Sequence, residues 1–237
     1  MKPLRTRDAI IAVIGLAACV PILARTTLNS PRTRAEATGF RETSRYADVI
    51  AFIDSLHDRP LTFGSIGKTS EGRAIPYIIA SYPQVSTPDE ARALKRPIVY
   101  VQANIHAGEV EGKEALLALV RDLSAAPRPN VLDSIVLIAV PIYNADGNER
   151  FASQSVNRTE QNGPELVGVR ANGQGLDLNR DYIKAEAPET RASLVMFNTW
   201  DPDVFVDLHT TDGSYHGYAL TYAPPLHPSA PLGPYAR

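Results

Sequence analysis

The sequence predicts an α/β fold, an α/β/α sandwich around a mixed, largely parallel sheet. Two observations support this prediction. First, continuous runs rich in apolar and β-branched residues, typical of strands covered on both faces, occur at 97–105, 134–140 and 204–208. Second, segments with apolar residues at helical spacing separate these runs, and strands that alternate with helices form layered α/β structures. Ligands of such sheets bind beyond the carboxyl ends of the strands, so residues at those ends are candidates for function.

The N-terminal segment predicts export. Three basic residues precede the apolar run 9–18, which is short for a transmembrane helix. We therefore expect a signal peptide over residues 1–24 and a periplasmic or extracellular protein. Cys19 is the only cysteine, and residues 16–19 are similar to the lipobox of bacterial lipoproteins, in which the cysteine is acylated. Ordinary secretion and a lipid anchor to the membrane through Cys19 both remain open.

The first elements of the folded part follow a polar stretch. Residues 25–42 predict a linker before a domain that spans 43–237. Helical spacing of apolar residues predicts an amphipathic helix over 44–57. Two strands follow at 61–67 and 75–82, and the turn between them is compatible with a hairpin.

Strands and helices alternate in the rest of the domain. A helix is predicted to start after Glu109 and to end before Pro127. The remaining predicted elements are strands at 97–105, 134–140 and 204–208 and a helix from about Pro188 to Trp200.

Composition and the absence of two motifs argue against several classes of protein. The chain has 237 residues and 44% hydrophobic content, enough for a full core in one or two domains. A net charge of −2 gives no electrostatic reason to expect nucleic acid as a partner. Neither a His-Glu-x-x-His helix nor a Gly-x-Ser-x-Gly elbow occurs in the sequence, which argues against two common hydrolase classes.

A metal site is predicted at the strand ends. His106 and Glu109 lie three residues apart where a strand turns into a helix, and His209 ends another apolar run. Two imidazoles, one carboxylate and a position left for water are the ligand set of a hydrolytic zinc centre. One Zn²⁺ bound there predicts hydrolysis, because zinc brings the pKa of water to about 7 and polarises a carbonyl. Asp177 could accept the second imidazole proton of a ligand histidine.

Five motifs in a fixed order carry a family resemblance. They are Ile66–Arg73, His106–Glu109, Asn144–Gly147, Gly175–Arg180 and Asp207–His209. With them, residues 44–222 resemble the zinc carboxypeptidase family, the carboxypeptidase A-like metallopeptidases. The resemblance implies an exported metallocarboxypeptidase that uses a zinc-activated water to hydrolyse C-terminal residues of peptides with a free C-terminal carboxylate.

The resemblance also implies residue roles. The zinc ligands would be His106, Glu109 and His209. Asp177 matches the carboxylate that orients the first ligand histidine. Asn179 and Arg180 match the pair that binds the substrate's terminal carboxylate, a task suited to a guanidinium fork. Arg170 matches the catalytic arginine that polarises the scissile carbonyl and stabilises the oxyanion. The remaining motif residues are interpreted as turn formers and loop braces: Glu71, Arg73, Asn144, Asp146 and Gly147.

Two departures from the family pattern stand out. Many members have an arginine inside the His-x-x-Glu motif where this chain has Gly108, so substrate contacts should differ. The family's general base is a glutamate several dozen residues beyond the third zinc ligand, but nothing acidic follows Asp212. We therefore expect a fragment of a longer enzyme, with a sheet incomplete at the C-terminus, that is inactive by itself. His216 and His227 could act as substitute bases, but we favour the interpretation that both are exposed loop histidines.

Two alternatives remain at this stage. Related zinc-dependent deacylases of N-acyl amino acids share the His-x-x-Glu, Asp-Leu-Asn-Arg and Asp-Leu-His-Thr-Thr stretches, although the Glu-Gly-Arg and Asn-x-Asp-Gly motifs favour the peptidase. The absent glutamate also motivates a non-catalytic zinc- or peptide-binding surface protein.

Overall fold

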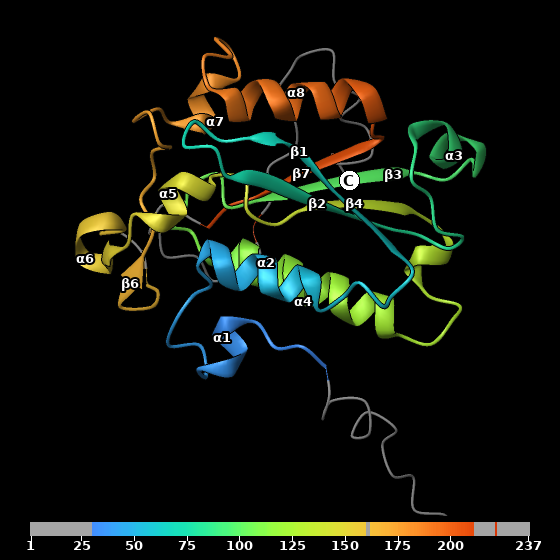
Figure 1. Ribbon diagram of the computed structural model, residues 1–237, viewed down its shortest axis with the longest axis horizontal. Coiled ribbons are helices and arrows are strands. Elements are labelled where there is room, and N and C mark those ends of the chain that lie inside the picture. The colour runs from blue at the N-terminus through green and yellow to red at the C-terminus, as the bar shows by residue number, and fades with distance from the viewer. Residues whose placement is uncertain (1–29, 160–161, 211–220, 222–237) are drawn as a thin grey trace, which may run out of the picture. The chain divides into compact units, whose positions relative to one another are not determined.

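The computed structural model describes residues 30–159, 162–210 and 221. A compact unit begins at Pro31. The predicted signal peptide and Cys19 lie outside the described residues, as do His216 and His227. The central sheet has the strand order β1-β2-β4-β3-β7 (Figure 1). Its strands are β1 (Leu61–Lys68), β2 (Ala74–Ala80), β3 (Ile98–Ala103), β4 (Val136–Val140) and β7 (Val204–Leu208).

The predicted mixed sheet is confirmed, with fewer parallel pairings than expected among the described strands. The hairpin β1–β2 and the pair β2–β4 are antiparallel, whereas β4–β3 and β3–β7 are parallel. The β3–β7 register pairs Gln102 with Asp207 and Ala103 with Leu208. Both strands therefore end at the same edge, and the residues that follow them emerge side by side.

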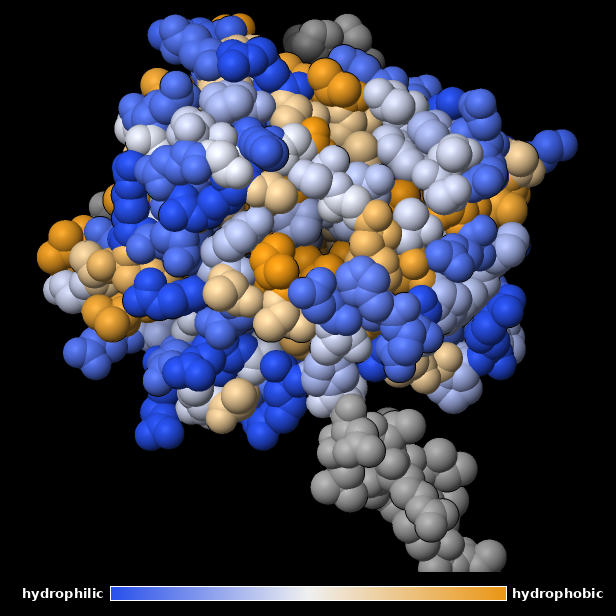
Figure 2. Space-filling view, viewed as in Figure 1, coloured by the Kyte–Doolittle hydropathy of each residue, from blue (hydrophilic) through white to orange (hydrophobic). Residues whose placement is uncertain are grey.

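Helices cover both faces of the sheet. α2 (Tyr46–Asp54) and α4 (Glu111–Ala125) lie on one face, and α8 (Pro188–Trp200) lies on the other (Figure 1). These helices and the five strands confirm the elements predicted from apolar spacing. On the face seen in Figure 2, hydrophilic residues dominate and apolar residues form small separate patches. Within the described part, no helix combines the length and apolar character needed to span a bilayer.

The core has two halves, one on each face of the sheet. Val101 packs in the half beneath α2 and α4, and Tyr100 packs in the half beneath α8. Ile78 and Ile79 of β2 divide in the same way. Successive side chains point to opposite faces of a strand, so strands covered on both faces read as continuous apolar runs.

Short elements connect this framework. They are α1 (Arg34–Ala37), α3 (Pro88–Ala93), η2 (Val131–Asp133), α5 (Ala145–Glu149), β5 (Ala152–Ser153), α6 (Gln154–Asn157), β6 (Leu166–Val167) and α7 (Leu178–Asp181). β5 and β6 pair as a separate two-stranded sheet.

The predicted linker, residues 25–42, is wrong for its described part. α1 is capped by Thr33, which is buried, and Glu36 binds Arg121 of α4 through two bonds of 2.5 and 2.9 Å. Arg121 also donates to the carbonyl of Pro31 at 3.0 Å. The polar composition of this stretch therefore reflects capping and ion pairing against α4, and the folded unit begins about a dozen residues earlier than predicted.

Candidate metal centre

The three predicted ligands meet where β3 and β7 end. Asn104 leaves β3 in the left-handed region, with φ of 67°, and His106 follows it as a buried side chain. Glu109 closes the turn into α4, since its N–H donates to the carbonyl of His106 at 2.9 Å. His209 is the first residue after β7, and its side chain is 29% exposed. The parallel register of β3 and β7 thus brings together residues about a hundred positions apart.

The Glu109 carboxylate lies between the two imidazoles. Oε1 is 2.8 Å from Nδ1 of His106, and Oε2 is 3.2 Å from Nδ1 of His209. Oε2 also accepts the N–H of Thr210 at 2.8 Å. One candidate ligand atom from each of the three side chains lies within 4.8 Å of the other two. This spacing is what a single small ion with three protein ligands requires.

Each histidine has an aspartate at its other nitrogen. Nε2 of His106 is 3.1 Å from Oδ1 of Asp177, and Nε2 of His209 is 3.0 Å from Oδ2 of Asp207. Both rings thus have carboxylate oxygens at both nitrogens, although a neutral imidazole has only one N–H. A cation held by the two histidines and Glu109 would resolve this mismatch, because each histidine could then keep its single proton on Nε2, facing its aspartate. Two nitrogens and a carboxylate oxygen fit zinc.

The pKa values of Glu109 and His209 reflect their mutual contacts. Burial by itself raises the pKa of Glu109, but hydrogen bonds from His106, His209 and the Thr210 N–H outweigh burial and hold the pKa well below its usual range. Burial lowers the pKa of His209, but the hydrogen bonds and charges of Asp207 and Glu109 raise it to about 9. The Glu109 carboxylate therefore stays ionised at neutral pH. A metal ion bound at Nδ1 of His209 would displace the proton that this nitrogen otherwise carries.

A cavity of about 420 Å³ opens beside these residues. It is lined by His106, Gly108, Glu109, Asn157, Arg158, Thr159, Arg170, Asn179, His209 and Thr210. Its volume is in the range of small-ligand sites. A cavity that contains the candidate metal ligands is where a substrate would meet the metal.

Arg170 and Asn179 lie at this cavity, as their predicted roles require. The Arg170 guanidinium donates to Oδ2 of Asp177 at 2.9 Å, and its Nη1 is 3.1 Å from Nδ1 of His106. The N–H of Asn179 donates to Asp177 at 3.0 Å. Arg180 is exposed and does not line the cavity; its Nη1 donates to the carbonyl of Asn179 at 3.4 Å. The geometry thus brings together the predicted site residues except Arg180.

Two site residues were missed from the sequence. Asp207 occupies a motif position in β7, and His209 follows two residues later, directly after the strand. Residues two apart in extended backbone point to the same side, which is a usable signal. Arg158 lies in a segment without periodicity between two motifs, so no local pattern indicated it. Its buried guanidinium donates to Glu111 at 3.0 Å and to Thr210 at 2.9 Å, and the residue lines the cavity.

The known proteins that this chain resembles in sequence are carboxypeptidases. Residues 48–227 match the sequence profile of the zinc carboxypeptidase family. The chain is 28% identical over 144 residues to probable carboxypeptidase 2 of Trichophyton verrucosum, which covers 60% of the chain and 24% of that protein. It is 32% identical over 124 residues to human carboxypeptidase Z, covering 50% of the chain and 18% of that protein. The chain thus spans about a quarter or less of the curated relatives it matches.

Solved structures show the same fold. Carboxypeptidase A of Helicoverpa armigera superposes with a TM-score of 0.57 at 21% identity, over 80% of this chain and 51% of that one. A metallo-carboxypeptidase from Burkholderia cenocepacia gives 0.55 at 21% identity, over 73% and 43%. The profile match covers well over half of the sequence, and it includes all three candidate ligands. The chain belongs to the zinc carboxypeptidase family.

Proposed function

We propose that the full-length protein is a zinc-dependent metallocarboxypeptidase that hydrolyses the C-terminal residue of peptides with a free C-terminal carboxylate. One observation carries the proposal: His106, Glu109 and His209 converge, with an aspartate behind each histidine, at a cavity large enough for a peptide end. Membership of the zinc carboxypeptidase family supports the same reaction class.

The residues at the cavity divide the work of this reaction. His106, Glu109 and His209 would hold the zinc ion, which supplies Lewis acidity and lowers the pKa of water to about 7. Arg158 and Arg170 place two guanidinium groups on the cavity wall. Such groups bind a substrate carboxylate or stabilise the oxyanion that develops at the scissile carbonyl.

The proton acceptor is the open part of this mechanism. Among the described residues that line the cavity, Glu109 is the only one with a carboxylate, and we assign that carboxylate to metal binding. We infer that the base comes from outside the described residues, and we propose, from the glutamate that the family resemblance implies beyond the third zinc ligand, that the 237-residue chain alone is inactive. Assays of the chain and of the full-length protein, side by side on one peptide, test this; equal turnover would contradict it.

Export is proposed from the N-terminal residues. Basic residues followed by the apolar run 9–18 are typical of a signal peptide. The mature protein would then act outside the cytoplasm, with or without an acyl anchor at Cys19. The mass of the native protein's N-terminal peptide tests both points, because an acylated Cys19 and a start after Ala24 give different masses, whereas an intact Met1 start would contradict export.

The activity is tested with the zinc-loaded full-length protein. A short peptide and an N-acyl amino acid, both with free carboxylates, are offered in parallel. We expect release of the C-terminal residue from the peptide, loss of that release in His106→Ala, and its inhibition by a chelator. Preference for the N-acyl amino acid would instead indicate a deacylase. Zinc binding without turnover of either would indicate a binding protein.

A further inference from the structure

We propose that Asn144 is a positioning residue of the metal centre, because its side-chain amide ties the segment that carries His106 to the loop that carries Arg170 and Asp177. This inference rests on the proposed function and adds a residue to its machinery. From sequence, Asn144 was interpreted as structural, one of the turn formers and loop braces, with no role at the metal centre. Its contacts in the structure reach further than its own turn.

The side chain of Asn144 is fully buried at the start of α5, and its polar atoms are all engaged. Nδ2 donates to two carbonyls from different segments, that of Ile105 at 3.2 Å and that of Arg170 at 3.1 Å. Oδ1 accepts the N–H of Gly147 at 2.9 Å, and the backbone N–H donates to the carbonyl of Asn104 at 3.1 Å. The amide nitrogen of Asn144 thus links the segment after β3 to the loop that contains Arg170.

Both carbonyls belong to residues next to the chemistry. The Ile105 carbonyl is part of the peptide unit that leads into His106. The orientation of this peptide unit therefore determines the position of the His106 backbone, from which the imidazole extends. The Arg170 carbonyl fixes the backbone of the residue whose guanidinium reaches Asp177 at 2.9 Å and approaches His106 at 3.1 Å. Asp177 in turn contacts Nε2 of that histidine at 3.1 Å. The relative position of ligand and loop therefore depends on the amide of Asn144.

The turn that holds Asn144 is itself packed tightly against this loop. A Cβ at Gly147 would lie 2.5 Å from the carbonyl oxygen of Ala171, so only glycine permits the approach. The carbonyl of Gly147 also accepts the N–H of Val169 at 2.9 Å. The loop is thus fixed on both sides of Arg170, and a change at Asn144 acts on a backbone that has little room to adjust.

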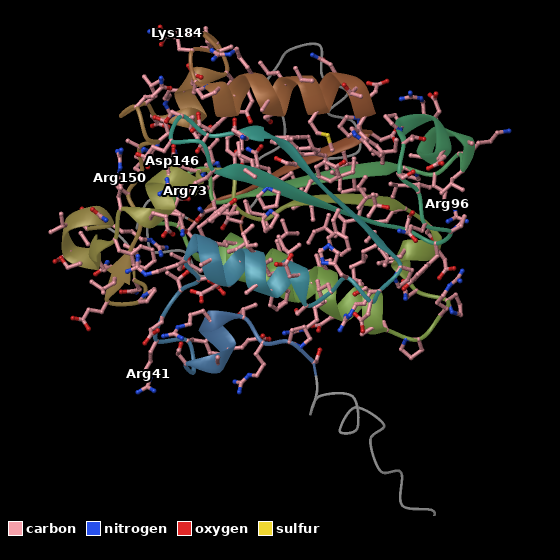
Figure 3. All side chains as sticks on the ribbon, in the orientation of Figure 1. Arg41, Arg73, Arg96, Asp146, Arg150 and Lys184 are labelled. Atoms are coloured by element: carbon pink, nitrogen blue, oxygen red, sulfur yellow. The ribbon has the colours of Figure 1, made fainter. Side chains whose placement is uncertain are left out.

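The neighbouring Asp146 supplies a natural comparison, because it faces away from the metal centre. Its carboxylate accepts from Thr69 Oγ1 at 2.7 Å, Ser70 Oγ at 3.0 Å and Arg73 Nη1 at 2.7 Å, all at the tip of the β1–β2 hairpin. Figure 3 shows Arg73 and Asp146 together at α5, with Arg150 nearby. Removing the Thr69 contact weakens the same turn and leaves the hydrogen bonds of Asn144 to Ile105 and Arg170 in place.

The test compares variants of the zinc-bound full-length protein. Asn144→Asp keeps the shape and the acceptor for Gly147 but turns a carboxylate oxygen toward two carbonyls. Asn144→Ser is milder, since its hydroxyl can donate to only one of them. Thr69→Val, isosteric and buried, is the matched control on the other side of the turn. The readouts are the zinc dissociation constant from chelator competition, the unfolding midpoint of the zinc-free protein, and kcat and KM separately.

We expect both Asn144 variants to bind zinc about 10-fold or more weakly, as loss of a group that orients metal ligands does. We also expect a lower kcat at saturating zinc. Thr69→Val should lower the unfolding midpoint and leave the zinc dissociation constant unchanged. If the Asn144 variants lose stability but bind zinc like the control, the positioning role is overturned. If the parent protein itself binds no zinc, the proposed function fails first, and the two failures are distinguishable.

Discussion

Each of the two candidate histidine ligands has an aspartate carboxylate at Nε2, and Asp207 allows the proposed orienting role of such a carboxylate to be tested. We expect Asp207→Asn to weaken zinc binding about 10-fold, because His209 loses the group that holds its proton on Nε2. Asp203→Asn, at the other end of β7, is the control; its carboxylate accepts the N–H of Ile98 at 2.8 Å, far from the centre. Zinc titration of both variants checks this, and equal affinities would contradict the role of Asp207.

The surroundings of Gly108 bear on the departure from the family pattern at this position, where many members have an arginine. A Cβ there would lie 3.0 Å from the carbonyl oxygen of Gly168 and 3.4 Å from that of Asn157. Backbone oxygens would therefore crowd the Cβ of any larger residue at this position. We expect Gly108→Ala to lower the free energy of unfolding by about 1–2 kcal/mol, as overpacking does. Urea denaturation measures this change, and an unaltered unfolding free energy would show that the loops move aside freely.

At the scale of elements, the carboxylate of Asp146 joins the β1–β2 hairpin to α5. Burial raises the pKa of Asp146, but hydrogen bonds from Thr69, Arg73, the Glu71 N–H and Ser70 lower it by more. The pKa therefore lies below 3.8, the ordinary value of an aspartate. A lowered carboxyl pKa stabilises the fold above pH 3.8, and this stabilisation is lost as pH falls through the lowered value.

The corresponding prediction concerns Asp146→Asn. We expect a loss of about 2 kcal/mol at pH 7, the magnitude of hydrogen bonds to a charged group. The difference from the parent should shrink as the pH falls from 3.8 through the lowered pKa, because the parent carboxylate takes up a proton, first in the unfolded chain, and then carries no charge, like the amide of the variant. Unfolding curves across this range measure it. A difference that stays constant down to the acid transition would mean that the charge is not what stabilises the contact.

The attachment of α1 to α4 makes a second prediction about elements. Glu36 pairs with Arg121, whose side chain is only 9% exposed, whereas Glu42 pairs with Arg34 at a half-exposed site. We expect Glu36→Gln to cost about 2 kcal/mol of unfolding free energy and Glu42→Gln less than about 0.5 kcal/mol. Urea denaturation of both variants is the measurement. Equal losses would contradict the view that residues 31–41 are part of the folded domain.

At the scale of the whole molecule, the sequence predicted most of the framework. Buried strands and amphipathic helices have strong periodic patterns, and β7 and α8 were predicted at their observed bounds. The metal ligands were predictable because His-x-x-Glu and the second histidine follow apolar runs. The fold of residues 31–41 was not, since polar caps and ion pairs have no periodic pattern. Arg158 and the exposure of Arg180 also depend on tertiary packing that no local pattern encodes.

The central claim is that His106, Glu109 and His209 hold one zinc ion, and the most direct test is native mass spectrometry of the full-length protein. The account predicts one zinc per chain in the parent and none in the His106→Ala, His209→Ala double variant, with both proteins folded by circular dichroism. A folded parent that takes up no zinc from a zinc-containing buffer, or a double variant that retains the ion, would contradict it.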